Sequence, residues 1–421
     1  MRPSAWPRRS TTPWPSRSAS RPARAKRPRP TPPATCAHPS APPRPPTPPA
    51  PPGPSLPSPL RPCDLPGAAR VPETAPSQIP VAVVGPTGYT GLELIELLCR
   101  HPRLRPAYLA SARAEPARMT REFPRLAGRL PAGLAPDTEP INHDAIAGRC
   151  RLAFLCLPHE AAMEHAPQLL RRGVKVVDLS AAYRLKDPAV YAAAYGHAHT
   201  DPAGLARAVY GLPELFGQRL SGAALVANPG CYPTAAALTI APLLRDGLAE
   251  PSSPIVYAAS GVSGAGREPK PHLTLAEAGE NFSAYGIGVH RHQPEIEQSL
   301  RWAAPDQAAA VRVLFLPHLL PIERGILETI VLEPARAGLT TADVTDTLRR
   351  AYAGHPLVVV RDEAPAVRDA QRTARVHVNA RLVGGRIVAV AAIDNLAKGA
   401  AAQAVQNANI LMGIDPLAGV E

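Results

Sequence analysis

The sequence predicts an α/β protein whose first domain is a doubly wound parallel sheet, preceded by a disordered N-terminal tail. A β-branched run at residues 81–84 leads through a glycine-rich turn into residues 92–98, where Leu and Ile recur at helical spacing. Two further apolar runs, 151–158 and 174–180, alternate with helical stretches such as 159–172. Strands that alternate with helices in this way are typical of parallel sheets with helices on both faces.

Residues 1–76 have the composition of a disordered tail. They hold close to half of the 54 prolines and carry nearly all of the net charge of +12. Such a segment cannot bury enough apolar surface to offset its ordering entropy. Nucleic-acid binding and an organellar transit peptide stay open as alternatives, although interleaved aromatic residues are missing. We favour plain disorder, or an upstream extension from a misplaced start codon, and therefore expect a cytoplasmic protein that binds no nucleic acid.

Composition also limits the other classes of protein. No run of about eighteen uncharged apolar residues occurs, so we expect no membrane span. The tail lacks the apolar region of a secretory signal. The six cysteines have neither metal nor disulfide spacing, which favours a reducing compartment and no metal site.

The glycine-rich turn carries the spacing of a dinucleotide-binding fingerprint. Gly85 suits a tight turn, Gly88 allows the backbone to approach a pyrophosphate, and Gly91 allows close packing of helix on strand. An ordinary turn between strand and helix is the alternative. The residues that we assign to the cofactor here are Gly85, Thr87, Gly88, Tyr89, Thr90 and Gly91.

The end of the next predicted strand, near residues 106–110, indicates which dinucleotide is bound. Ser111 and Arg113 stand where an NAD site usually places an acidic residue for the ribose 2′-hydroxyl. A hydroxyl and a guanidinium suit a 2′-phosphate, so we infer NADP(H). Arg113 as a solvated surface charge remains the alternative. Cys99 and Cys156 lie within apolar segments, and we interpret both as core residues.

Cys231 is either a small buried hydrophobic residue or a nucleophile. Asn228, Pro229 and Gly230 indicate a turn, and the residues from Thr234 onward have the composition of a buried helix. Cys231 would then open a helix, where free N–H groups and the helix dipole favour a thiolate. The pattern by itself leaves both readings open.

A base for such a thiol lies sixty residues further on. His290 and His292 flank Arg291, and Glu295 follows. Histidine titrates near neutrality, and two histidines two residues apart on an extended strand would face one cleft. A structural pair or a pair of metal ligands are the alternatives, the second without a third ligand at suitable spacing.

A second glycine- and serine-rich stretch, residues 259–270, lies between the thiol and the histidines. Ser260, Ser263 and Gly264 offer small side chains and free N–H groups, with Arg267 and Lys270 close by. These are the ingredients of a site for a phosphate or carboxylate. A flexible surface loop is the alternative.

These motifs together resemble the N-acetyl-gamma-glutamyl-phosphate reductase family, which is related to the aspartate-semialdehyde dehydrogenases. The resemblance runs from about residue 79 to 413. It is carried in order by GPTGYTG, FLCLPHEAA, VVDLSAAYRL, VYGLPEL, NPGCYPTAA, SGVSGAGR, HRHQPEI, HLLPIERGIL and DNLAKGAAAQAVQNANILMG. NPGCYPT followed by HRHQPEI is highly specific.

The resemblance implies roles for individual residues. The family's nucleophile matches Cys231 and its acid/base histidine matches His290, with His292 and Glu295 at further active-site positions. The chain departs from the family pattern at two places. The cofactor turn has Pro86-Thr87 in place of Ala-Ser, and the segment after Asp-Leu-Ser has Ala182-Tyr183-Arg184 in place of Asp-Phe-Arg. The resemblance and the loop chemistry together place Ser260, Gly264 and Asn395 at the cofactor, and Arg184 and Ser263 at the substrate.

The resemblance also implies an architecture and a reaction. A Rossmann-type NADP-binding domain over 77–230 would be followed by an α+β catalytic and subunit-contact domain with a mainly antiparallel sheet over 231–391. A C-terminal helix over 392–421 would return to the first domain. The implied homo-oligomer, a dimer or tetramer, would reduce N-acetyl-glutamyl 5-phosphate with NADPH in arginine biosynthesis, through a thioester on Cys231. The alternatives are a sister reductase for aminoadipyl or aspartyl phosphate, a nucleic-acid-associated protein, and a regulatory pseudoenzyme.

Overall fold

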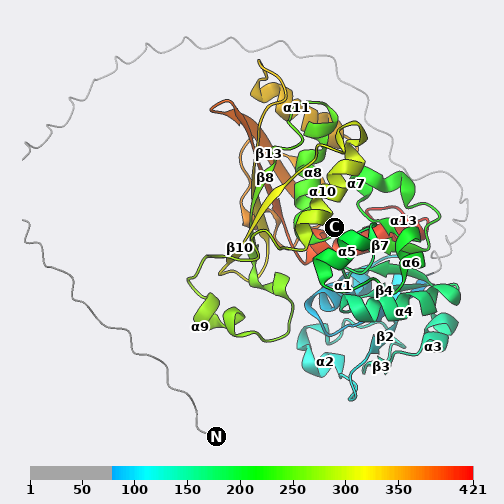
Figure 1. Cartoon of the computed structure of the whole chain (residues 1–421). Coiled ribbons are helices and arrows are strands. Elements are labelled where there is room, and N and C mark those ends of the chain that lie inside the picture. Colours follow the sequence, from blue (N-terminus) through cyan, green and yellow to red (C-terminus); the bar gives the residue numbers. More distant parts are fainter. Residues whose placement is uncertain (1–77, 421) are drawn as a thin grey trace, which may run out of the picture. The chain divides into compact units, whose positions relative to one another are not determined.

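The structure is a computed structural model that describes residues 78–420, so the tail expected over 1–76 lies outside the described residues. The described residues form two seven-stranded sheets (Figure 1). Among residues 78–420, no helix combines the length and the apolar character needed to cross a bilayer.

The first sheet is parallel throughout, with strand order β3-β2-β1-β4-β5-β7-β6. Its strands are β1 (Ile79–Val84), β2 (Leu104–Ser111), β3 (Glu139–Pro140), β4 (Leu152–Leu155), β5 (Lys175–Asp178), β6 (Val209–Tyr210) and β7 (Leu225–Ala227). Its helices are α1 (Tyr89–Arg100), α2 (Met119–Glu122), α3 (His143–Arg149), α4 (His159–Arg171), α5 (Pro188–Tyr195), α6 (Pro202–Arg207) and α7 (Pro213–Phe216).

Alternate residues of β1 enter two different cores, which is what a doubly wound sheet requires. Val81 and Val83 pack with residues of α1 and of the C-terminal helix α13 (Ala402–Leu411). Ala82 and Val84 pack with residues of α3 and α4 on the other face. Burial on both faces explains why the strand is a continuous apolar run without polar alternation.

The second sheet is mixed, with strand order β12-β13-β14-β11-β8-β10-β9. Its strands are β8 (Ile255–Gly261), β9 (Ser283–Ala284), β10 (Leu314–Leu320), β11 (Ile326–Leu332), β12 (Val358–Val360), β13 (Val376–Val383) and β14 (Arg386–Ile393). The helices that accompany it are α8 (Cys231–Arg245), α9 (Leu275–Ala278), α10 (His292–Ala303), α11 (Thr341–Tyr352) and α12 (Val367–Ala370). Four of its six pairings are antiparallel, and β8 with β10 and β12 with β13 are parallel.

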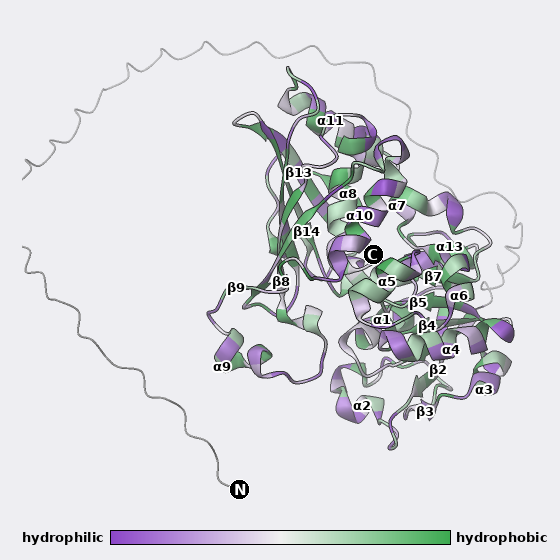
Figure 2. Cartoon of the chain, in the orientation of Figure 1, coloured by the Kyte–Doolittle hydropathy of each residue, from purple (hydrophilic) through white to green (hydrophobic). Residues whose placement is uncertain are grey.

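Helix α8 lies in the core beneath this sheet. Its residues from Tyr232 to Leu244 are all buried, and they share one core with the inner face of β8, β11, β13 and β14 and with α10 and α11. Figure 1 shows these helices on one side of the sheet, and the hydrophobic colouring in Figure 2 runs through α8 and the strands beside it. The buried position of α8 explains its Ala- and Leu-rich sequence.

The opposite face of the sheet carries partly exposed apolar side chains. Leu314, Ile255, Val331 and Val388 stand in register on four neighbouring strands, and Tyr257 lies in the next row with almost half of its surface exposed. In Figure 1, no described helix covers this face. This face of the sheet therefore presents apolar side chains to its surroundings.

The predicted α/β class, the parallel first sheet and the mainly antiparallel second sheet are confirmed. Helix α13 packs with residues of the first sheet, and Lys175 Nζ donates to the Leu411 carbonyl at 2.7 Å. This helix begins at Ala402 and is preceded by a π-helical turn at Ala397–Ala401, so the segment before residue 397 is not helical. The domain boundaries after residues 230 and 391 stay predictions.

Candidate functional site

Cys231 is the first residue of α8, immediately after the turn that follows β7. Because β7 and β1 belong to one parallel sheet, their carboxyl ends lie at the same edge, and the thiol therefore shares that edge with the glycine-rich turn. Gly230 occupies the N-cap in an extended conformation, and no side chain among the described residues caps the helix. Free N–H groups of the first turn therefore lie next to the sulfur.

A cavity of about 460 Å³ opens in front of the thiol. It brings together six of the residues that the sequence singles out: Cys231, Arg184, Ser260, Gly264, His290 and His292. These residues come from four separate segments of the chain, so the fold assembles them. Cys231 is thus neither an inaccessible core residue nor distant from the imidazoles.

The two histidines stand at the start of α10, not on an extended strand as we expected. Arg291 has helical dihedral angles, and Pro294 in the first turn favours the helix. The rings nevertheless meet, with centroids 4.9 Å apart. The His292 backbone N–H donates to His290 Nδ1 at 3.1 Å, so a neutral His290 carries its proton on Nε2. His292 Nε2 lies against Gly230, where an added Cβ would be 2.6 Å away.

Glu295 lies behind the cavity and does not line it. Its Oε1 accepts hydrogen bonds from the Gly230 backbone N–H and from the Tyr210 hydroxyl, both at 2.8 Å. Its Oε2 stands 3.6 Å from the Arg184 guanidinium, which also donates to the Asn228 carbonyl at 2.8 Å. Glu295 and Arg184 therefore fix the backbone on which Cys231 is mounted.

The reacting groups are all neutral at pH 7 in this structure. Burial raises the pKa of the Cys231 thiol to about 12, although the nearby Arg184 opposes the shift. Burial lowers the pKa of His290 to about 4 and that of His292 well below its usual range. Desolvation of the thiol thus outweighs the favourable effect of the helix N-terminus in the cavity as it stands.

The glycine-rich turn fits a dinucleotide. Gly85 has φ +87°, and a Cβ there would lie 2.3 Å from the Cys156 carbonyl oxygen. A Cβ on Gly91 would lie 2.4 Å from the Gly85 carbonyl oxygen, so Gly91 permits close packing and the positive φ of Gly85 suits a tight turn. Gly88 is the N-cap of α1, and no described atom lies within 4 Å of its would-be Cβ. The helix N-terminus therefore faces open space, as pyrophosphate binding requires.

Ser111 and Arg113 lie at the end of β2, as predicted. Ser111 accepts a hydrogen bond from the Arg113 backbone N–H at 3.2 Å. The Arg113 guanidinium is held by both carboxylate oxygens of Glu122, at 3.0 and 2.9 Å. A 2′-phosphate would share this guanidinium with Glu122. The assignment of Arg113 to the cofactor stays a prediction.

The loop at 259–270 connects the cavity with the glycine turn. Arg267, in the loop that follows β8 of the second sheet, donates to the carbonyl of Thr87, in the turn that follows β1 of the first sheet, at 3.0 Å. Ser263 and Tyr89 line a second cavity, which adjoins the first because both cavities include Lys270. A cofactor extended from the turn toward the thiol would follow this loop.

Asn395 and Ser263 hold one another, and neither lines the cavity of Cys231. Asn395 Nδ2 donates to the Ser263 hydroxyl at 3.0 Å, while its Oδ1 accepts the Gly325 N–H at 2.7 Å. Both polar groups of the Asn395 side chain are thus engaged in fixing the loop. Their predicted contacts with cofactor and substrate stay predictions.

Sequence reasoning missed the aromatic part of the cavity wall. Tyr195, Tyr232 and Tyr285 line the cavity, and the Tyr232 and Tyr285 hydroxyls are 3.0 Å apart. The Tyr232 ring meets His290 and His292 edge to face, at 5.8 and 5.6 Å. Tyr232 follows Cys231 directly, and that adjacency was the one available signal.

Comparison with known proteins agrees with this arrangement. Residues 80–223 match the semialdehyde dehydrogenase NAD binding domain and residues 231–395 the semialdehyde dehydrogenase dimerisation domain. Aspartate semialdehyde dehydrogenase II from Vibrio cholerae superimposes with a TM-score of 0.61 at 19% identity, over 80% of this chain and 99% of that chain. The Candida albicans enzyme, solved with NADP, also gives 0.61, at 17% identity, over 80% and 99%. Fold and matched domains thus define an oxidoreductase of the semialdehyde dehydrogenase class.

Sequence relatives narrow the class further. N-acetyl-gamma-glutamyl-phosphate reductase from Rhodopirellula baltica is 41% identical over 348 residues, which are 82% of this chain and 99% of the relative. The reductase from Geotalea daltonii is 44% identical over 346 residues, 81% and 97% of the two chains. The chain belongs to the N-acetyl-gamma-glutamyl-phosphate reductase family.

Proposed function

We propose that this chain reduces N-acetyl-L-glutamyl 5-phosphate to N-acetyl-L-glutamate 5-semialdehyde and phosphate with NADPH, in arginine biosynthesis. The observation that carries the proposal is the meeting of Cys231, His290 and His292 in one cavity beside the glycine-turn loop. The names of the relatives supply the substrate.

The first step is attack by the Cys231 sulfur on the acyl carbon. A carbon–sulfur bond forms, the bond from carbon to the phosphate oxygen breaks, and phosphate leaves with that electron pair. The thiol proton must be removed as the bond forms, because the thiol is neutral. We assign the acceptor role to His292, since its ring is neutral and its Nε2 lies against Gly230, the residue that precedes Cys231.

His290 takes the opposite role. Its Nδ1 is engaged by the His292 N–H, so its Nε2–H is available to donate to the carbonyl or leaving-group oxygen. Arg184 adds a positive charge at the cavity wall, which stabilises developing negative charge. Glu295 is a positioning residue, because it holds Gly230 and Arg184 from behind.

Residues of the glycine turn would hold the pyrophosphate of NADPH, with Gly88 and the N-terminus of α1 facing it. When bound, NADPH supplies the hydride that reduces the thioester. The chain's own contribution is to keep the acyl group attached to Cys231, so that it cannot diffuse away between the two steps.

The apolar face of the second sheet would form the contact between subunits of a homo-oligomer. This region carries the match to a dimerisation domain, and its exposed apolar row crosses four strands. As a biosynthetic enzyme, the protein would work in the cytoplasm.

NADPH consumption with a panel of acyl phosphates tests the proposal. We expect turnover with N-acetyl-glutamyl phosphate to exceed that with aspartyl and N-acetyl-aminoadipyl phosphate, and NADPH to be preferred over NADH. Cys231→Ser should abolish turnover and leave NADPH binding near normal. His290→Asn should lower kcat by about 10²- to 10⁴-fold. A Cys231→Ser variant that keeps more than about a tenth of the rate would remove the thiol from the mechanism.

A further inference from the structure

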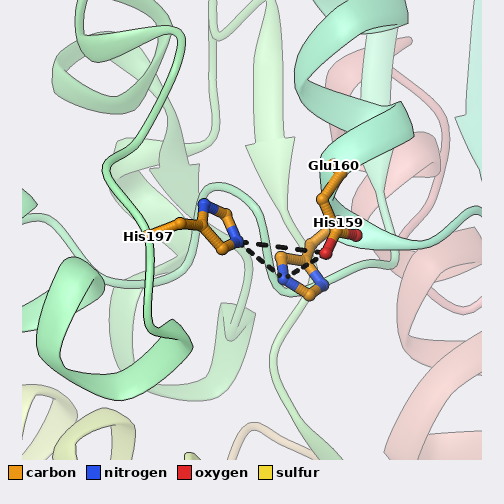
Figure 3. Close-up of side chains that lie close together, drawn as sticks. All are labelled: His159, Glu160 and His197. Atoms are coloured by element: carbon orange, nitrogen blue, oxygen red, sulfur yellow. Dashed lines mark hydrogen bonds and ion pairs between the residues drawn. The ribbon is translucent and has the colours of Figure 1, made fainter.

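We propose that His159, Glu160 and His197 form a binding site for a divalent transition-metal ion of the zinc class, at the first sheet. The three side chains converge in Figure 3. His159 Nε2 lies 3.3 Å from His197 Nε2 and 3.2 Å from Glu160 Oε1, and His197 Nε2 lies 3.9 Å from the same oxygen. Two imidazoles and one carboxylate are a ligand set that zinc accepts.

Two of the three separations between the ligand atoms are near those around a tetrahedral ion, and the His197–Glu160 separation of 3.9 Å is longer, so the exposed Glu160 carboxylate would move inward on binding. Zinc binds nitrogen and oxygen at about 2.0–2.2 Å, so its tetrahedral ligands are about 3.3–3.5 Å apart. The two imidazole rings are inclined by only 14°, with centroids 5.4 Å apart, so that their Nε2 atoms face one another across a short gap.

Two helices present these ligands. His159 and Glu160 open α4, immediately after β4, and His197 follows Gly196, the residue that ends α5. Gly196 has φ +79°, a left-handed conformation that turns the chain back toward α4. The ligands thus come from segments 38 residues apart, a separation at which no sequence spacing indicates a metal site.

The surroundings hold the imidazoles in place and leave an ion accessible. Tyr195 stands 4.9 Å from the His159 ring, and Tyr191 meets the His197 ring edge to face at 5.6 Å. Glu160 is 61% exposed, so the carboxylate side of the site faces solvent. Three protein ligands and a water molecule would complete four-coordination.

The site borders the catalytic cavity without sharing a ligand with it. Tyr195 lines that cavity and also carries the Arg291 guanidinium over its ring, at 5.3 Å. A bound ion would join α4 to the end of α5 and so fix this aromatic part of the cavity wall. The inference does not rest on the proposed function, because it concerns binding alone.

Cobalt binding to the full chain tests the proposal. Tetrahedral Co²⁺ absorbs visible light far more strongly than octahedral Co²⁺, so chelator-treated protein titrated with Co²⁺ should develop an intense band that Zn²⁺ removes. Loss of a residue that only supports a metal ligand typically weakens the affinity about 10- to 100-fold. His197→Ala and Glu160→Gln remove ligands themselves, so each should weaken the affinity for Co²⁺ by more than that. Glu160 is exposed, so its variant should fold.

Two control variants separate the site from other ligands. His165→Ala removes a ring that faces His143 at 3.1 Å but belongs to no three-ligand group among residues 78–420, and it should retain wild-type affinity. Cys231→Ser should also retain the band. The proposal is overturned if wild-type protein gives no intense band, if the two ligand variants keep it, or if only Cys231→Ser loses it.

Discussion

Gly399→Ala should disable the enzyme through a single added methyl group. Gly399 lies in the π-helical turn before α13, and an added Cβ would lie 2.7 Å from the Cys231 Cβ and 3.1 Å from the Asp394 carbonyl oxygen. Ordinary contact begins near 3.4 Å, so the two carbons must separate by about 0.7 Å. Overpacking lowers the free energy of unfolding by about 1–3 kcal/mol. The higher helix propensity of alanine offsets up to about 1 kcal/mol of this loss.

The effect on turnover should be larger than the effect on stability. A displacement of about 1 Å at a reacting group can cost about 10²-fold in rate, so we expect kcat for NADPH oxidation to fall about 10- to 100-fold. Gly148→Ala is the matched control, because Gly148 lies within α3 and no described atom is within 4 Å of its would-be Cβ. That variant should be fully active and slightly more stable. If Gly399→Ala keeps wild-type kcat, the close contact with Cys231 is refuted.

Three further predictions follow from the charges and surfaces. With a pKa of about 12, the Cys231 thiolate is about 10⁻⁵ of the total at pH 7. Iodoacetamide should therefore alkylate Cys231 about 10³-fold more slowly than a free thiol. Peptide mass spectrometry should show an alkylation rate that rises up to pH 9, and a plateau below pH 8 would contradict this prediction. Arg113→Ala should raise KM for NADPH about 10- to 100-fold and leave KM for NADH unchanged. Arg149→Ala is the control, because it removes a similar arginine–glutamate pair, with Glu139, and should change neither KM value. By light scattering, Leu316→Glu on the apolar sheet face should yield monomers and Leu275→Glu should not; the reverse result would move the subunit contact to α9.

Much of the fold could be predicted because its signals are local. The strand, turn and helix around Gly85 occupy consecutive residues, and period-two alternation marks β11, β13 and β14. Helix α8 was predictable for the same reason, since a turn and a buried apolar helix meet at Cys231. The histidine pair misled because a two-residue spacing suits a strand, whereas Pro294 and the following residues start a helix.

The rest of the site depends on contacts between distant segments. Glu295 holds the Gly230 N–H across 65 residues, and a sequence pattern cannot tell such a positioning residue from one that faces the substrate. Gly399 is required by the approach of one backbone to another, which no composition reveals. His159 and His197 converge only because α4 and the end of α5 pack together.

The charge states decide how the thiol is activated. The shift of the Cys231 pKa from 9.0 to about 12 corresponds to about 4 kcal/mol against the thiolate, whereas a helix N-terminus contributes at most about 2 kcal/mol in its favour. Burial therefore keeps the sulfur protonated and unreactive while the cavity is free of substrate. An acyl phosphate brings negative charge next to His290 and His292, and a nearby anion raises the pKa of an imidazole. The substrate itself thus strengthens the base that removes the thiol proton, so activation of the nucleophile is coupled to occupancy of the cavity.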